Sequence, residues 1–353
     1  MRRPSAPSPI AWLAVATLFA GPTPPGAIPQ SPDPLFASDA LLELTFQADL
    51  KTLFKDRDST KAQWHAATLT YRDASGAPVA LAIKAKTRGH WRLKPSQCDF
   101  PPLRLDFPKE QPGSSPFAGQ DKLKLTTPCR GKSAEYEQYV LREFLVYKIY
   151  NYLTPLSFRA RLARITYADS AGRSDTLTRY SFFVEDQRKM AERNGGGILE
   201  TQGARFADLD FDQVGLVSAF EYLIGGTDWS VYGLHNIRLV KSNQGDKIVP
   251  VPYDFDWTGI VWTRYSFPDS RLPITTVRQR LYRGQCRTPE QWAPVLARFN
   301  EQKDAIYALY DRLPDLDPKY GKQTKQYLDD FYRIIDEPKA VRREFIAACR
   351  EGA

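Results

Sequence analysis

The stretch from Gly225 to Trp257 constrains the fold of this chain more than any other part of the sequence. Two β-prone runs, Ile237–Lys241 and Lys247–Tyr253, flank the turn sequence Asn243–Asp246 (Asn-Gln-Gly-Asp). This pattern predicts a β-hairpin, because Asn, Gly and Asp favour tight turns between paired strands. A hairpin returns its second strand to the point where the first began, so residues at its open end come together.

Polar residues stand at that open end. A turn centred on Gln244 and Gly245 sets Asn236 opposite Tyr253 and therefore next to Asp254. Strict alternation along the strands would point Asp254 to the opposite face from Asn236. The second run contains two prolines, which lack an amide donor and disfavour a regular ladder, and a bulge there would restore the facing.

The same stretch contains further oxygen ligands. Asp228 precedes the hairpin, and Asp256 follows it two residues after Asp254. Carboxylate and amide oxygens suit Mg²⁺ or Mn²⁺ that carries phosphate. In phosphoryl transfer by protein kinases, one Asp accepts the acceptor's proton, while an Asn and a later Asp hold the metal ions. The alternative is that these residues only cap turns, where Asp and Asn are common.

The order Asp228, Asn236 and Pro252–Asp256 (Pro-Tyr-Asp-Phe-Asp) resembles the CotH kinase family of secreted and spore-coat atypical kinases. The resemblance implies an α+β, two-lobed atypical protein-kinase-like fold, with an antiparallel-sheet N-terminal lobe and a mainly helical C-terminal lobe. It also implies ATP and Mg²⁺ or Mn²⁺ as cofactors, and a protein or other hydroxyl acceptor. Asp228 would then be the catalytic residue, and the metal ligands would be Asn236, Asp254 and Asp256.

Candidate phosphate ligands lie upstream. Arg88-Gly89 matches the start of an Arg-Gly-Asn-x-Ser signature of the family, although His90 and Trp91 replace the polar residues that follow it. A lysine on a strand before a helix is where a kinase places its phosphate-pairing lysine. Lys124 is the first candidate for that role and Lys86 the second. Solvent-facing lysines on amphipathic strands are the alternative.

Two glutamates complete the candidate set. A helix expected over residues 135–152 carries Glu143, which would pair with the strand lysine or face solvent. Glu185 follows an aromatic strand, and it would either approach the adenine at the junction of the lobes or serve as an N-terminal charge of a helix.

Hydrophobic periodicity predicts the remaining elements. A helix over residues 209–224 would end at Gly225-Gly226 and deliver the chain to Asp228. Asn194–Gly197 marks a break between an N-terminal lobe, residues 39–194, and a C-terminal lobe, residues 195–353. Strands are expected at 41–47, 67–72, 78–86, 102–107, 122–127, 161–167 and 176–184, and later helices at 290–313, 323–335 and 338–350.

The N-terminal residues predict export. A basic start and an apolar run, Ile10–Ala20, indicate a signal peptide over residues 1–27, followed by a Pro-rich flexible leader over residues 28–38. No other stretch approaches membrane-spanning length. We therefore expect a periplasmic, cell-surface or extracellular protein. Export permits disulfides among Cys98, Cys129, Cys286 and Cys349, and we favour the first two as a pair among the three pairings that four cysteines allow.

Composition narrows the function classes. The 353 residues carry a net charge of +8, which suits a phosphorylated ligand, but Lys and Arg are spread along the chain, which argues against a nucleic-acid partner. We weighed two functions besides an exported kinase. One is a non-catalytic exported envelope or coat protein that retains the fold. The other is a glycan hydrolase that uses Asp254 and Asp256.

Overall fold

The structure is a computed structural model, and it describes residues 33–349. The predicted signal peptide and the first part of the leader lie outside the described residues. Within residues 33–349, none of the helices combines the length and the apolar character that crossing a bilayer requires.

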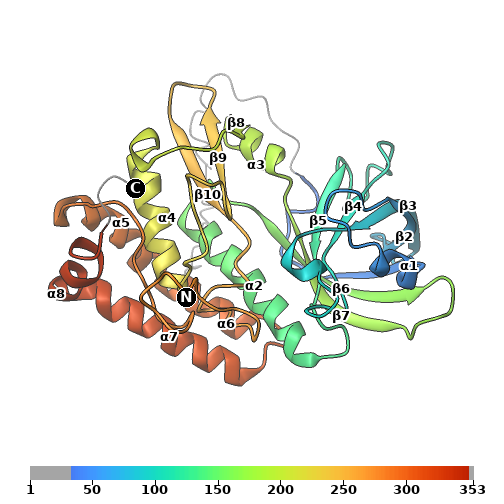
Figure 1. The fold of residues 1–353 in the computed structure, drawn as a ribbon. Coiled ribbons are helices and arrows are strands. Elements are labelled where there is room, and N and C mark those ends of the chain that lie inside the picture. Colours follow the sequence, from blue (N-terminus) through green and yellow to red (C-terminus); the bar gives the residue numbers. More distant parts are fainter. Residues whose placement is uncertain (1–32, 350–353) are drawn as a thin grey trace, which may run out of the picture. The chain divides into compact units, whose positions relative to one another are not determined.

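Seven strands of the described chain close into a barrel, in the order β1-β2-β3-β4-β5-β7-β6 (Figure 1). Closure depends on β1, which pairs antiparallel with β2 and parallel with β6. A closed barrel leaves no unpaired strand edge. The strands are β1 (Leu42–Ala48), β2 (His65–Arg72), β3 (Pro78–Thr87), β4 (Leu103–Asp106), β5 (Lys122–Thr126), β6 (Ala160–Asp169) and β7 (Leu177–Val184).

The barrel interior explains why these residues form strands. Fully buried leucines alternate with partly exposed polar residues along two strands. On β4 these leucines are Leu103 and Leu105, and on β5 they are Leu123 and Leu125. This alternation places apolar side chains inside the barrel and polar ones outside. A short helix, α1 (Leu50–Lys55), follows β1.

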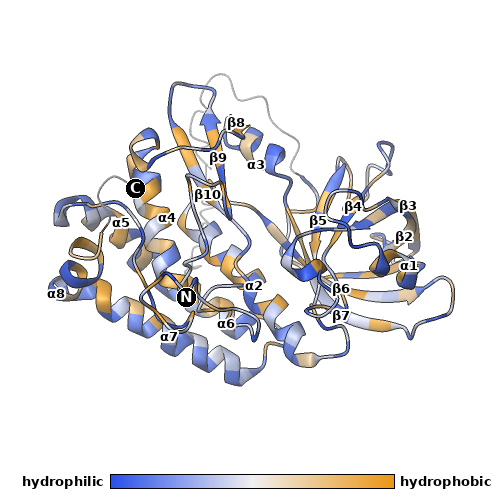
Figure 2. Cartoon of the chain, viewed as in Figure 1, coloured by the Kyte–Doolittle hydropathy of each residue, from blue (hydrophilic) through white to orange (hydrophobic). Residues whose placement is uncertain are grey.

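A second sheet and most of the helices follow the barrel in sequence. The sheet has the order β10-β9-β8, and α4 packs on β10 and α5. Figure 2 shows hydrophilic and hydrophobic residues side by side along α5, α6 and α7, as expected for helices with one exposed face. The elements are α2 (Ala134–Leu153), α3 (Gln187–Arg193), β8 (Gly196–Leu199), α4 (Phe211–Ile224), β9 (Ile237–Ser242), β10 (Ile248–Pro252), α5 (Pro289–Glu301), α6 (Lys303–Arg312), α7 (Pro318–Asp336) and α8 (Pro338–Val341).

Helix α2 connects the barrel to the helical part. It packs on β6, β7 and α6, and twelve of its residues, including Glu143 and Tyr147, are buried. The apolar core around it extends to α4 and the second sheet. Residues on α2 therefore lie between the barrel strands and the hairpin β9–β10.

The expected two-lobed fold with an antiparallel-sheet N-terminal lobe is wrong. The first seven strands form a closed mixed barrel, because β1 and β6 pair in parallel from Leu42–Ala163 to Ala48–Asp169. The later residues combine helices with the sheet of β8, β9 and β10, which includes the expected hairpin. Alternation along single strands predicts where strands lie but not which distant strands pair, so closure was invisible in the sequence. A boundary between residues 194 and 195 stays a prediction.

Most local elements agree with the sequence analysis, but two expected C-terminal helices do not. The helix expected over residues 338–350 is only α8, followed by a π-helical turn at Arg342–Ile346. The single helix expected over residues 290–313 is two helices, α5 and α6, with Gln302 as the shared cap. Gln302 has φ −98° and ψ 1°, which lies outside the helical range and breaks the ladder.

Two disulfides cross-link the described chain. Cys98 pairs with Cys129, as expected, and Cys286 pairs with Cys349, with Cα–Cα distances of 4.6 Å and 4.8 Å. The first joins the segment after β3 to the end of β5. The second ties the segment before α5 to the C-terminal turn.

Replacing Cys98 and Cys129 together by Ala should lower the free energy of unfolding by about 3–4 kcal/mol. The bond spans a sequence separation of 31, and removing it restores loop entropy to the unfolded chain. Urea unfolding followed by tryptophan fluorescence measures the change. The pair Cys286→Ala with Cys349→Ala, at a separation of 63, should cost slightly more, and an unchanged midpoint for either pair would contradict the expectation.

Candidate functional site

The end of α4 positions Asp228. Gly225 ends the helix in the left-handed conformation, with φ 68°, and its N–H bonds to the carbonyls of Glu221 and Tyr222. Such a C-cap favours glycine, because a side chain strains the left-handed region. Three residues later Asp228 is exposed, at the surface of the loop.

The loop from Asp228 to Asn236 folds back on itself. Ser230 and His235 exchange backbone hydrogen bonds of 2.9 Å and 3.0 Å. Leu234 and Asn236 both adopt positive φ, 50° and 51°. The reversal returns the chain to Asp228 before β9 begins.

Both carboxylate oxygens of Asp228 have polar partners as a result. His235 Nε2 lies 3.0 Å from Asp228 Oδ1. The Asn236 amide donates to the Asp228 carbonyl at 2.8 Å and to Oδ2 at 3.3 Å. Because the Asn236 amide nitrogen is used in this way, its oxygen is left as an acceptor.

The hairpin has the predicted register. Ile237 pairs with Pro252, and Tyr253 N–H donates to Asn236 O at 3.0 Å. The expectation of an irregular ladder is wrong, because the pairing is continuous from Ile248 to Pro252. Pro250 lies at a position whose backbone faces away from β9, as does Pro252, so neither lost donor breaks the ladder.

A left-handed residue, rather than a bulge, redirects the chain after β10. Asp254 has φ 66°, and its N–H donates to the Tyr147 hydroxyl of α2 at 3.0 Å. Phe255 is buried against Tyr147 and Phe220, with ring centroids 4.8 Å and 5.6 Å away. The buried Phe255 ring anchors the Asp254–Asp256 segment to the core.

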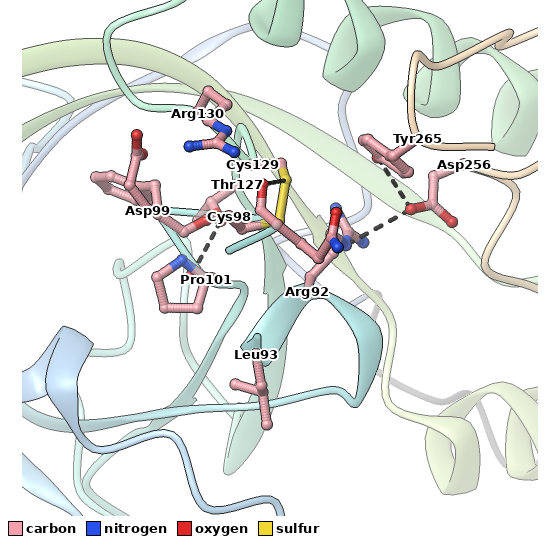
Figure 3. Close-up of a disulfide and its surroundings, with 12 residues drawn as sticks. Arg92, Leu93, Cys98, Asp99, Pro101, Thr127, Cys129, Arg130, Asp256 and Tyr265 are labelled. Carbon is pink, nitrogen blue, oxygen red and sulfur yellow. Dashed lines mark hydrogen bonds and ion pairs between the residues drawn. A yellow bond between two sulfur atoms is a disulfide. The ribbon is translucent and has the colours of Figure 1, made fainter. Parts of the chain in front are cut away.

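Arg92 joins the two carboxylates that flank Phe255. It lies in a short turn, Trp91–Leu93, and its guanidinium is 3.8 Å from Asp254 Oδ1 and 3.6 Å from Asp256 Oδ2. Figure 3 shows Arg92 and Tyr265 reaching the same carboxylate of Asp256, with the Tyr265 hydroxyl donating at 3.0 Å. Both carboxylates therefore lie on one guanidinium, so they are close in space.

Glu143 lies beneath this cluster on α2. It is 2% exposed. Burial, reinforced by Asp256, raises its pKa well above the usual range of a carboxyl, although Arg92 opposes the shift. Burial also raises the pKa of Asp256, again against the effect of Arg92. The site thus concentrates acidic groups where one arginine supplies the nearest positive charge.

A row of three basic residues crosses the outer face of the barrel. Lys86 on β3 pairs directly with Arg104 on β4, which pairs with Lys124 on β5. Like charges directly opposite each other destabilise a sheet. Within residues 33–349, no ion pair joins a carboxylate to any of the three.

The neighbouring row shows the ordinary arrangement. Two residues along the strands, Lys84 pairs with Asp106, which pairs with Lys122. Lys122 Nζ lies 3.7 Å from Asp106 Oδ1. The barrel therefore places an acid within one outer row and leaves the row of Lys86, Arg104 and Lys124 without one.

The basic row continues toward Asp254. Lys124 and Arg238 both lie over the ring of Tyr253, at 4.7 Å and 4.5 Å from its centroid. Burial and the guanidinium groups of Arg88 and Arg238 lower the pKa of Lys124 to about 7. Burial likewise lowers the pKa of Arg88, with Asp254 opposing. Crowded cations of this kind favour an anionic ligand.

Two predicted ligands have partners outside the cluster around Asp254. Lys86 stands over the ring of Trp64, 4.9 Å from its centroid. Glu185 is 3% exposed, and its carboxylate accepts two hydrogen bonds of 3.0 Å from Arg193 and one from the Arg159 N–H. The structure thus brings Arg88, Lys124, Asp254 and Asp256 together, but it holds Glu185 in a separate ion pair.

The oxygen ligands fit a divalent cation that brings its own phosphate. Among residues 33–349, no group of three or more His, Cys, Asp or Glu side chains is arranged to hold a metal ion. Mg²⁺ often needs only one or two carboxylates, since water and substrate phosphates complete its shell. Asp254, whose side chain is 37% exposed, and the free oxygen of Asn236 are the candidates that such an ion would meet.

An open cavity adjoins Asp228 on the side of His235. Its volume is about 800 Å³, and Trp229, Trp257 and Phe267 contribute aromatic walls. Trp229 is 6% exposed, and its buried Nε1 has no hydrogen-bond partner among the described residues. The cavity gives a second molecule access to the Asp228 carboxylate.

Sequence reasoning missed several members of the site. It considered as site members neither His235, which contacts Asp228, nor Arg92, which contacts Asp256. It also missed Arg104, whose role depends on cross-strand pairing. The alternating polar positions of β3, β4 and β5, compared with one another, would have revealed an all-basic row once the register was known.

Comparisons with known proteins do not assign this chain to a family. No protein-family description matches it, and no curated protein matches it. A solved structure that it resembles is the Helicobacter pylori proinflammatory kinase CtkA, at 11% identity and a TM-score of 0.40, covering 69% of this chain and 94% of that one. A likeness this distant decides nothing about fold or activity, so the CotH relationship stays a prediction.

Glu221 is a buried acid behind the catalytic candidate. It is 4% exposed on α4, and its carboxylate lies against Gly226, where an added Cβ would collide with it. Burial and the nearby Asp228 raise its pKa to about 8. The folded chain therefore keeps a proton on Glu221 at a pH where the unfolded chain has released it.

This difference predicts a pH-dependent stability. A raised carboxyl pKa in the folded state means that the free energy of unfolding falls as pH rises from about 5 to about 8. In the Glu221→Gln protein, the decrease in the free energy of unfolding between pH 5 and pH 8 should be smaller by up to about 4 kcal/mol. Urea unfolding at pH 5, 6, 7 and 8 measures it. Glu301→Gln, at an exposed position on α5, should keep the wild-type slope, and equal slopes for all three proteins would refute the assignment.

Proposed function

We propose that this chain is an exported, ATP-dependent phosphotransferase of the CotH type, which transfers the γ-phosphoryl group to a hydroxyl acceptor. One observation carries the proposal. The unneutralised row of Lys86, Arg104 and Lys124 runs toward Asp254, and Asn236, which adjoins Asp254 in the hairpin, contacts Asp228. Phosphate ligands and a candidate base thus belong to one continuous site.

The basic residues hold the phosphates. Lys124 and Arg88 both interact with the charge of Asp254, and Arg238 lies with Lys124 over the Tyr253 ring. Phosphate oxygens relieve the repulsion among these cations, because each anion–cation bond replaces a like-charge contact. Bound phosphate also favours the charged form of Lys124, whose pKa lies near neutrality without it.

The acceptor approaches from the cavity beside Asp228. Asp228 accepts the proton of the acceptor hydroxyl as its oxygen bonds to the γ-phosphorus, and the bond to the bridging oxygen of ADP breaks. His235 and Asn236 hold the carboxylate from two sides, which fixes its direction. Orientation of this kind supplies a large share of catalysis in phosphoryl transfer.

A divalent cation would be held by Asp254 and the Asn236 oxygen, while Asp256 contacts Arg92 and Tyr265. Mg²⁺ or Mn²⁺ supplies charge neutralisation of the β- and γ-phosphates when bound. The protein residues fix where the phosphates lie relative to Asp228. Export agrees with the two disulfides, since such bonds persist in oxidising compartments.

Asp228→Asn should lower the rate of phosphoryl transfer by about 10²–10⁴-fold and leave nucleotide affinity within about twofold of wild type. The amide keeps the shape of the side chain but removes its basicity. Transfer from γ-labelled ATP with Mn²⁺ to serine- and threonine-containing peptides, together with ATP hydrolysis, measures the rate. Asp246→Asn, at an exposed turn of the same hairpin, serves as the control.

The outcome separates the proposal from its alternative. Unchanged transfer by the Asp228 variant removes that residue from catalysis. A folded wild-type protein that binds no MgATP in calorimetry supports a non-catalytic exported envelope or coat protein instead.

Lys124→Met should weaken binding of Mg²⁺ with adenylyl imidodiphosphate by about 10–100-fold, because one hydrogen bond between charged groups contributes about 1.5–3 kcal/mol. Lys84→Met, on β3 of the same barrel, is a matched control. Lys84 lies opposite Asp106, in the row that contains an acid, so its loss should change affinity less than twofold. Equal effects of the two substitutions in titration calorimetry would show that the basic row is ordinary surface.

A further inference from the structure

We propose that Arg92 occupies the place of one of the two divalent cations used by protein kinases, so that this site binds its nucleotide with a single metal ion. The inference rests on the proposed function and deepens it. Protein kinases hold two ions between an Asp, an Asn and the phosphates. Here a fixed guanidinium lies between the two carboxylates of the Asp254–Asp256 segment.

The position of Arg92 is the first argument. Its guanidinium lies 3.8 Å from Asp254 and 3.6 Å from Asp256. The Asp256 side chain is only 9% exposed, and its Oδ2 also accepts from the Tyr265 hydroxyl. An ion bridging both carboxylates would have to displace Arg92 from a buried position.

The anchoring of Arg92 is the second argument. Arg57 donates to the carbonyls of Leu93, Cys98 and Asp99, at 3.3, 2.6 and 3.0 Å, and so holds the segment that follows Arg92. The Cys98–Cys129 disulfide fixes the far end of the same segment (Figure 3).

Trp91, the residue before Arg92, is also held in place. Trp91 packs on Tyr265 and Trp257, with centroids 4.9 Å and 5.6 Å away. A guanidinium tethered on both sides is preorganised, so it cannot withdraw at low cost when a cation arrives.

Charge is the third argument. Asp254 and Asp256 contribute two negative charges, and Arg92 contributes one positive charge between them. One divalent cation then balances the remaining carboxylate and part of the phosphate charge, and the basic row of Lys86, Arg104 and Lys124 meets the rest. A second divalent cation would add positive charge to a site that already holds crowded cations.

The competing interpretation is that Arg92 is a structural latch, which moves aside when metal and nucleotide bind. Both interpretations predict a loss of stability when Arg92 is removed. Only the proposal predicts that removal changes the number of bound metal ions, so metal stoichiometry distinguishes them.

The experiment counts Mn²⁺ bound per chain in the presence of saturating adenylyl imidodiphosphate, by electron paramagnetic resonance of the free ion. The intact wild-type protein should bind one ion. Arg92→Met, which keeps the aliphatic stem but removes the charge, should bind two. Arg92→Lys should bind one. Arg130→Ala removes a neighbouring arginine that contacts Ser96 O but neither carboxylate, and it should also bind one.

Two ions on the wild-type protein would overturn the proposal whatever the variants do, and so would a single ion on a folded Arg92→Met protein. If the Arg92→Met protein does not fold, the number of Mn²⁺ ions bound to the wild-type protein tests the proposal. Absence of any nucleotide-dependent Mn²⁺ binding to wild type would overturn the proposed function itself, a result distinct from binding of two ions.

Discussion

The site depends on the register of the hairpin β9–β10 and on the two left-handed residues at its open end. Pairing of Ile237 with Pro252 places Asn236 and Asp254 beside each other, and positive φ at both residues turns the chain out of the strands. A slip of one residue would exchange the faces of the whole strand. Phe255, packed on Tyr147 and Phe220, opposes such a slip, because it would lose its buried position.

Unequal distribution of charge is the second constraint. Asp254, Asp256 and Glu143 gather around Arg92, while Lys86, Arg104 and Lys124 stand in a row without an acid. Either cluster alone is unfavourable, since burial penalises charge and like charges repel. The proposed ligand, which carries both a cation and several phosphates, would satisfy both clusters at once. The row of Lys84, Asp106 and Lys122, in which an acid lies between two lysines, shows that the barrel does not require an all-basic row for its own stability.

The sequence predicted the parts of the structure that depend on neighbouring residues. Alternation located the strands, the Asn-Gln-Gly-Asp turn fixed the hairpin register, and Gly225 marked the end of α4. It failed where distant residues decide. Parallel pairing of β1 with β6 closes the barrel, and Arg92 reaches Asp256 across more than one hundred and fifty positions of chain. No local pattern distinguishes Arg92 from other arginines. The prolines Pro250 and Pro252 were expected to disrupt the ladder, because the sequence does not show that their backbone nitrogens face away from β9 on an edge strand.

Barrel closure also explains how a surface of simple strands acquires a specific charge pattern. Closure fixes the neighbours of every strand, so Lys86, Arg104 and Lys124 stay in line. Helix α2 then ties the barrel to the hairpin, because Tyr147 holds Asp254 while α2 packs on β6 and β7. The fold therefore contributes position, and the chemistry comes from side chains at the contact between barrel and hairpin.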